Sequence, residues 1–133
     1  MRYWLILCFG LLICGCSESP QSSLLVPPPH LLQQPEQQQA GAVLFYRYCR
    51  ECHGTLSEGR NRHAGRFVAA APDFKSRSYL DTKPAYLYMR IAQGKQVEPY
   101  RSQGSVMPAW EAHLSEQQIW QLVAYLRQRA GAD

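Results

Sequence analysis

The strongest hydrophobic pattern in the chain lies near its C-terminal end. Apolar residues recur there at intervals of three and four positions and form one stripe, made of Ile119, Leu122, Val123 and Leu126. This spacing predicts an amphipathic helix with one buried face. Ser115 and Gln118 match a capping box, and Leu114 with Ile119 matches a hydrophobic staple. We therefore expect this helix to begin directly after Ser115.

Basic residues and a glycine mark the other end of the same helix. Arg127 and Arg129 lie in its last turns, where positive charge complements the negative end of the helix dipole. Gly131 follows them, and glycine is frequent where helices stop. The pattern therefore predicts a helix end near Gly131.

Two earlier segments also have helical patterns. Residues 40–49 lack proline and can place three residues on one side of a helix, namely Val43, Leu44 and Tyr48. Asp81 and Thr82 can cap a further helix that has Pro84 in its first turn and stops at Gly94.

The remaining segments predict loops. Residues 54–80 combine glycines, charges and a proline, and residues 95–113 carry no helical stripe. No segment alternates convincingly enough to indicate a strand. The predicted fold class is all-α, with three or four short helices and long loops over residues 40–131. A domain this small buries little apolar surface by itself, so a large apolar cofactor would supply the missing interior.

The N-terminal segment has the pattern of an export signal. Arg2 precedes an uncharged apolar run at residues 3–13, shorter than the roughly 20 residues that span a bilayer. These features predict a signal peptide over residues 1–15. The closing ICGC resembles the bacterial lipoprotein box, which implies that Cys16 becomes the first residue and carries acyl chains. An ordinary cleaved signal peptide, or an uncleaved anchor, is the alternative.

A polar stretch follows the export signal. Residues 17–39 contain five prolines and six glutamines, which offer little to bury and disfavour helix. We therefore expect residues 16–39 to be a lipidated N-terminus and a semi-extended tether. The leader implies a bacterial cell-envelope protein that faces the periplasm and is held at a membrane by its lipid.

The formal charge of +4 is too small and too scattered to indicate a nucleic-acid partner.

Cys49, Cys52 and His53 form a C-x-x-C-H motif that allows three kinds of chemistry. A structural zinc site needs about four ligands, but no second cysteine pair follows and the histidines His63 and His113 are isolated. A thiol oxidoreductase needs its cysteine pair at the mouth of a βαβ unit, and no parallel sheet is indicated.

Covalent haem attachment is the third possibility and explains most features of the motif. Each thiol adds to a haem vinyl group, and one helical turn between Cys49 and Cys52 matches the two vinyl positions. The adjacent His53 is then held beneath the porphyrin, where a ring nitrogen reaches the iron. Export and the thin predicted core fit the same interpretation.

In its motifs the chain resembles a class I, monohaem cytochrome c of the bacterial lipoprotein type. Gly41 and Phe45 precede Cys49 with the spacing of that family, which implies a close crossing of the first and last helices. Tyr125 resembles the aromatic partner on the last helix. A further helical motif of the family is matched by Leu87, Ile91 and Gly94.

The resemblance also implies the surroundings of the haem. Pro72, in an A-P-D-F turn, would accept a hydrogen bond from His53. Met107, in an M-P-A-W loop, would be the sixth ligand of the iron through its sulfur, and Trp110 would pack near a propionate or in the core. Rival distal ligands are Met89, His63 and His113, none of which lies in a matching motif.

The function implied is transfer of single electrons, without bond-making catalysis, through one covalent haem c. Upstream and downstream partners would be a dehydrogenase and a terminal oxidase or reductase, with the chain either a free carrier or a fixed subunit. A haem enzyme or gas sensor with a displaceable methionine is the first alternative. A haem-free thiol oxidoreductase is the second.

Overall fold

The computed structural model describes residues 25–62 and 66–131. The expected leader, Cys16 and His63 lie outside the described residues. Within them the chain forms one short 3-10 helix and five α-helices: η1 (Leu31–Gln33), α1 (Pro35–Tyr48), α2 (Arg50–His53), α3 (Ser78–Asp81), α4 (Pro84–Gln93) and α5 (Glu116–Gly131). No strand occurs in the described ranges, so the predicted all-α class is confirmed.

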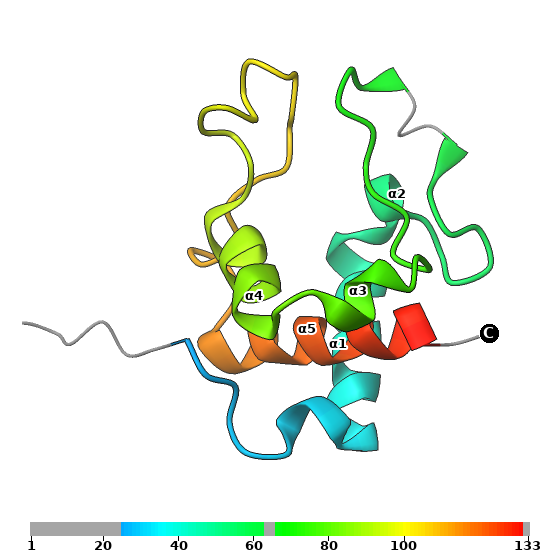
Figure 1. Ribbon diagram of the computed structural model, residues 1–133, viewed down its shortest axis with the longest axis vertical. Helices are drawn as coiled ribbons and strands as arrows, with labels where there is room; N and C mark the ends of the chain where they lie inside the picture. Colours follow the sequence, from blue (N-terminus) through cyan, green and yellow to red (C-terminus); the bar gives the residue numbers. More distant parts are fainter. Residues whose placement is uncertain (1–24, 63–65, 132–133) are drawn as a thin grey trace, which may run out of the picture.

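Helix α5 runs across the molecule, and η1, α1, α3 and α4 pack against it, whereas α2 packs against α1 (Figure 1). Its predicted capping box is confirmed, because the Ser115 amide donates to Gln118 Oε1 at 2.8 Å and the Gln118 amide donates to Ser115 Oγ at 3.2 Å. The staple residues Leu114 and Ile119 are both buried. Local sequence signals therefore fix where α5 begins.

Helices α1 and α5 cross in close contact at Gly41. A Cβ atom at this position would lie 2.0 Å from the Gln121 carbonyl oxygen and 2.9 Å from the Tyr125 Cβ. One turn further along α1, the Phe45 ring lies 5.2 Å from the Tyr125 ring, measured between centroids. The close crossing implied by the family resemblance is therefore present.

Helix α1 begins earlier than the sequence predicted. Pro35 occupies its first turn, a position that tolerates proline because the first amide of a helix has no partner in the helix. Before it, η1 places Leu31 in the core, where this side chain is 6% exposed. The Gln121 side chain of α5 also donates to Gln37 at 2.8 Å. Residues 31–39 therefore belong to the folded unit. The tether, which was predicted to extend to residue 39, ends before Leu31.

The segment before α4 also differs from the prediction. A separate turn of helix, α3, occupies Ser78–Asp81, which was expected to be loop up to residue 80. Thr82 does not cap α4, because its hydroxyl donates to the Ser78 carbonyl at 2.9 Å. Helix α4 begins at Pro84 with Lys83 as its N-cap and no side-chain cap bond. The described residues therefore form more helices than the three or four expected, and three of these six helices are single turns or shorter.

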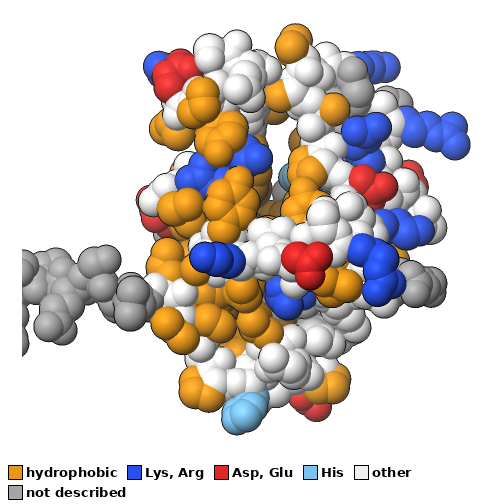
Figure 2. Space-filling model, viewed as in Figure 1, with side chains coloured by type: hydrophobic (Ala, Val, Ile, Leu, Met, Phe, Trp, Pro, Cys, Tyr) orange, Lys and Arg blue, Asp and Glu red, His pale blue; other side chains and the backbone are white. Residues whose placement is uncertain are grey.

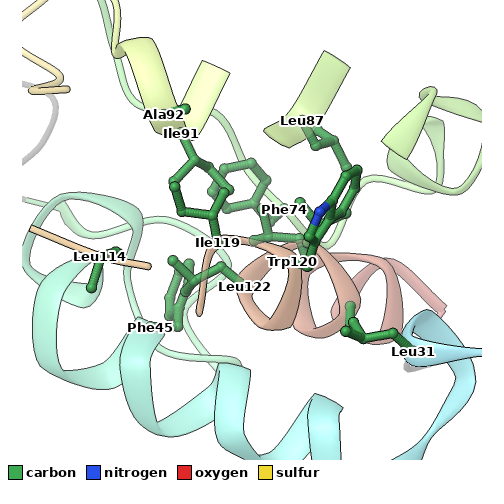
Figure 3. Close-up of a cluster of buried hydrophobic side chains, with 13 residues drawn as sticks. Leu31, Phe45, Phe74, Leu87, Ile91, Ala92, Leu114, Ile119, Trp120 and Leu122 are labelled. Carbon is green, nitrogen blue, oxygen red and sulfur yellow. The ribbon is translucent and has the colours of Figure 1, made fainter. Parts of the chain in front are cut away.

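The hydrophobic core lies between α5, α1 and α4, and Figure 3 shows members of this cluster from all three helices. Trp120, Val123 and Ala124 of α5 are fully buried. Two long loops rise from this base, one between α2 and α3 and the other between α4 and α5 (Figure 1). No helix in the described part of the chain is both long and apolar enough to cross a bilayer.

Candidate functional site

A cavity of about 390 Å³ opens between the two long loops. Figure 2 shows it as a deep hollow whose walls are largely hydrophobic. Its volume lies within the roughly 300–1,000 Å³ of typical cofactor and ligand pockets. All six residues that the sequence singled out for the haem line this one cavity: Cys49, Cys52, His53, Pro72, Met107 and Trp110.

Cys49 lies at the junction of α1 and α2, and Cys52 lies within α2. The Cys49 amide donates to the Phe45 carbonyl at 2.8 Å, and the Cys49 carbonyl accepts the amides of Cys52 at 3.2 Å and His53 at 2.9 Å. Both thiols are free and partly buried. Burial, with a smaller effect of Cys52, raises the pKa of Cys49 to about 12. A thiol with so high a pKa stays protonated near pH 7.

His53 lies in the cavity between aromatic side chains. Its ring centroid is 4.7 Å from that of Phe74 and 6.3 Å from that of Phe45. Burial lowers the pKa of His53 to about 4; the nearby Pro72 carbonyl opposes this shift, and the charge of Arg129 adds to it. The imidazole is therefore neutral near pH 7, the form that can bind a metal.

One nitrogen of this imidazole also has no partner. His53 Nδ1 is buried and lies outside hydrogen-bond geometry with every described residue, although the Pro72 carbonyl is close enough to influence the pKa of the ring. Buried polar atoms are nearly always satisfied in folded proteins. A small adjustment toward Pro72 would provide the missing acceptor, and such a bond is typical for histidines that bind metals.

On the opposite wall, Met107 lies in a segment that is attached to the end of α4. The Lys95 amide donates to the Met107 carbonyl at 3.0 Å, and the Met107 amide has a longer bond of 3.5 Å to Ser105 Oγ. Gly94 makes this contact possible, since it has φ +66° and a Cβ there would lie 2.5 Å from the Pro108 carbonyl. The C-terminal glycine of α4 therefore determines where Met107 can lie.

Trp110 closes the same segment. Its amide donates to the carbonyls of Ile91 at 3.2 Å and Ala92 at 3.0 Å, which satisfies carbonyls left free at the end of α4. Its ring lies 5.5 Å from that of Tyr48, beside Cys49. Trp110 is half-buried, lines the cavity and packs against the core, as one of its two expected environments requires.

The rivals of Met107 differ from it in position. Of those that the structure describes, Met89 lies within α4 and His113 is exposed, and neither lines the cavity. Within residues 25–62 and 66–131 no group of three or more histidine, cysteine, aspartate or glutamate side chains is arranged to hold a metal ion.

Three basic residues near the cavity were missed by the sequence interpretation. Arg90 and Lys95 line the wall on the Met107 side, where they pack on aromatic rings. Arg129, expected only to complement a helix dipole, is 1% exposed and donates to carbonyls around His53. Arg129 follows the stripe residues Leu122 and Leu126 at spacings of seven and three, which places it on the inner face of α5, but nothing in the sequence shows what it contacts.

This arrangement suits a large, planar and mostly apolar cofactor. Two thiols one turn apart, a neutral imidazole with an unpaired nitrogen and a thioether on the opposite wall surround an apolar cavity. Together with an all-α fold in which the first and last helices cross at a glycine, they define a class I cytochrome c.

Comparison with known proteins gives the family. The chain belongs to the family described as cytochrome c oxidase, cbb3-type, subunit III, which it matches over residues 36–126. No curated protein matches it. The protein is therefore a haem-binding, electron-transfer cytochrome whose family carries a covalently attached haem c.

Proposed function

We propose that the chain carries single electrons through one haem that is bound covalently to Cys49 and Cys52, with His53 and Met107 as the two axial ligands. The observation that supports this best is the convergence of these four residues on a single apolar cavity. The haem supplies the one-electron redox chemistry.

The side chains of the cavity would orient and tune the haem. His53 is held neutral by burial, and Pro72 lies where it can accept a hydrogen bond from the ring. The soft sulfur of Met107 would favour ferrous iron and so raise the reduction potential. The positive charges of Arg90 and Lys95, on the Met107 side of the wall, suit the two carboxylates of a haem.

Replacing the distal methionine tests the ligand assignment. Met107→Ala should remove the sulfur-to-iron charge-transfer band of the oxidised protein and lower its reduction potential. His113→Ala is the matched control, because this rival ligand is exposed and lies outside the cavity. Retention of the band in Met107→Ala, or its loss in His113→Ala, would overturn the assignment.

Carbon monoxide tests whether the iron has an open site. Two protein ligands leave no free position, so the reduced wild-type protein should bind carbon monoxide slowly and incompletely, and Met107→Ala should bind it readily. Rapid and complete binding by the wild type would instead favour a haem enzyme or gas sensor.

We also propose that Cys16 carries a lipid that holds the protein at the periplasmic side of a bacterial membrane. The lipoprotein-like ICGC at the end of the leader supports this. Cys16→Ser should release the protein from washed membranes into the soluble fraction. Unchanged membrane retention would contradict a lipid anchor at Cys16.

The proposed partners are an upstream dehydrogenase and a downstream terminal oxidase or reductase. The name of the family, a subunit of a cbb3-type oxidase, favours an oxidase as electron acceptor and a fixed subunit over a free carrier. Purification from native membranes in mild detergent should recover the chain with oxidase subunits. Recovery of the cytochrome alone, with rapid oxidation by soluble acceptors, would favour the free carrier.

A further inference from the structure

Arg129 is a charged residue in the core to which the electron-transfer proposal assigns no role. It lies in the last turn of α5 and is 1% exposed, while its neighbour Arg127 is half-buried. Burying a guanidinium is unfavourable unless its donors are paired. Burial lowers the pKa of Arg129 and the nearby Tyr125 and Asp73 oppose this shift, but a guanidinium keeps its proton in proteins.

Its two terminal nitrogens donate to the chain that begins at the histidine of the C-x-x-C-H motif, whereas its buried Nε has no partner among the described residues. Nη1 donates to the Gly54 carbonyl at 3.0 Å. Nη2 donates to the carbonyls of Thr55 at 2.8 Å and Gly59 at 2.8 Å, and more weakly to that of His53 at 3.2 Å. One side chain of α5 thus binds four carbonyls of the segment 53–59, here called the proximal segment.

The shape of the proximal segment explains why these carbonyls need a partner. Helix α2 is one turn long and ends at His53, so its last carbonyls have no amide partners within the helix. Gly54 and Gly59 both have positive φ angles, +67° and +72°, which turn the chain around the guanidinium. The rigid fork of an arginine can serve several acceptors at once, whereas the ammonium of a lysine cannot reach all of them in the same way.

Arg129 is also connected to His53 by packing. Its guanidinium carbon lies 4.9 Å from the centroid of the Phe45 ring, and that ring is in turn 6.3 Å from the His53 ring. A fixed positive charge is thus held in the protein interior beside the histidine. In an environment of low dielectric constant such a charge acts over this range with little screening.

We infer that Arg129 is the positioning residue for the proximal ligand: it fixes the backbone of residues 53–59, and so the orientation of the His53 ring, and it raises the reduction potential. The second effect follows because reduction removes one positive charge from the iron, which a nearby cation favours. The inference rests on the proposed function, since it presupposes His53 as a haem ligand.

Three variants separate geometry from charge. Arg129→Gln removes both, Arg129→Lys keeps the charge but not the fork, and Arg127→Gln is the matched control, because Arg127 donates to the distant Thr82 carbonyl at 3.0 Å. The reduction potential should fall in Arg129→Gln, recover largely in Arg129→Lys and stay unchanged in Arg127→Gln. The ferric electron paramagnetic resonance g-values, which report ring orientation, should shift in both Arg129 variants and not in the control.

Hydrogen exchange adds a test of the anchor itself. The amides of Gly54 and Gly59, bonded to the carbonyls of Arg50 at 2.7 Å and Thr55 at 3.2 Å, should exchange at least about tenfold faster in Arg129→Gln, because a charged hydrogen bond is worth such a factor. Arg127→Gln should not change them. Wild-type potential and g-values in Arg129→Gln would overturn the inference.

A wild-type measurement covers the case in which the Arg129 variants do not fold. In the wild-type protein the Nη protons of Arg129 should exchange far more slowly with solvent than those of the exposed Arg101. Equal exchange rates would contradict the anchor. Failure of the proposed function would look different, because the wild type would then lack covalent haem or the charge-transfer band whatever Arg129 does.

Discussion

The two walls of the cavity are held in different ways. The proximal segment, residues 53–59, is bound from beneath by Arg129 of the core helix α5, through four carbonyls. The distal segment, residues 105–110, is held by backbone bonds to the end of α4 and by the exposed Gln96 side chain, which donates to the Val106 carbonyl at 3.0 Å, and the Met107 amide itself has one long bond of 3.5 Å. Releasing His53 therefore requires disruption of the core, whereas releasing Met107 requires only a local movement of a loop.

The largest expected effect comes from removing the proximal attachment. Cys49→Ala combined with Cys52→Ala should abolish covalent haem, because no thiol remains in the cavity to form a thioether. Haem staining after denaturing electrophoresis measures this. Met107→Ala, on the distal wall, should retain full staining. Covalent haem in the double variant would show that attachment occurs elsewhere.

The next effect tests the helix crossing beneath the proximal wall. Gly41→Ala would place a methyl 2.0 Å from the Gln121 carbonyl oxygen, so we expect the free energy of unfolding to fall by about 3 kcal/mol. Gly131→Ala is the control, since its methyl would lie 3.6 Å from Leu80 in ordinary contact. Denaturant unfolding of both variants gives the comparison, and equal stabilities would contradict a tight crossing.

A smaller effect should be confined to the distal wall. Gly94→Ala combines a positive φ of +66° with a methyl 2.5 Å from Pro108, which we expect to cost about 1–2 kcal/mol and to displace the distal segment. The charge-transfer band should weaken while covalent haem is retained. Gly59→Ala, at φ +72° on the proximal segment, should cost similar stability but keep the band. A charge-transfer band that weakens equally in the two variants would show that the two walls are not independent.

The smallest expected effect concerns the start of α5 and should not distinguish the two walls. Ser115→Ala removes one of the two capping-box bonds of α5 and should lower the free energy of unfolding by about 1 kcal/mol. Because α5 supports the whole domain, the band and the haem content should not change. Urea unfolding followed by absorbance checks this, and a selective loss of the band would place Ser115 closer to the distal ligand than the structure does.

The sequence predicted best those features whose signals lie within a few neighbouring residues. Helix α5 was predicted closely because its cap, staple and stripe lie within a dozen residues. The sequence could single out six residues that line one cavity because the motifs expected for haem attachment and ligation are short. The start of α1 was missed because Pro35 was taken as a linker residue. The sequence does not show that Leu31 packs on the core, which makes the segment before α1 part of the folded domain.

Other features depend on contacts between distant parts of the chain. A basic residue in the last turn of a helix is common, so Arg129 had no local signal that distinguishes it from Arg127. Its carbonyl partners lie 70–76 residues earlier in the chain. Helix α3 likewise has no side-chain cap that the sequence could reveal. It packs against α5, which is distant in the sequence.

The most direct test of the central proposal is the mass of the peptide that contains the C-x-x-C-H motif, taken from matured protein after thiol alkylation and proteolysis. We predict a peptide heavier by one haem, with neither Cys49 nor Cys52 alkylated. A peptide of unmodified mass with both cysteines alkylated would contradict the account.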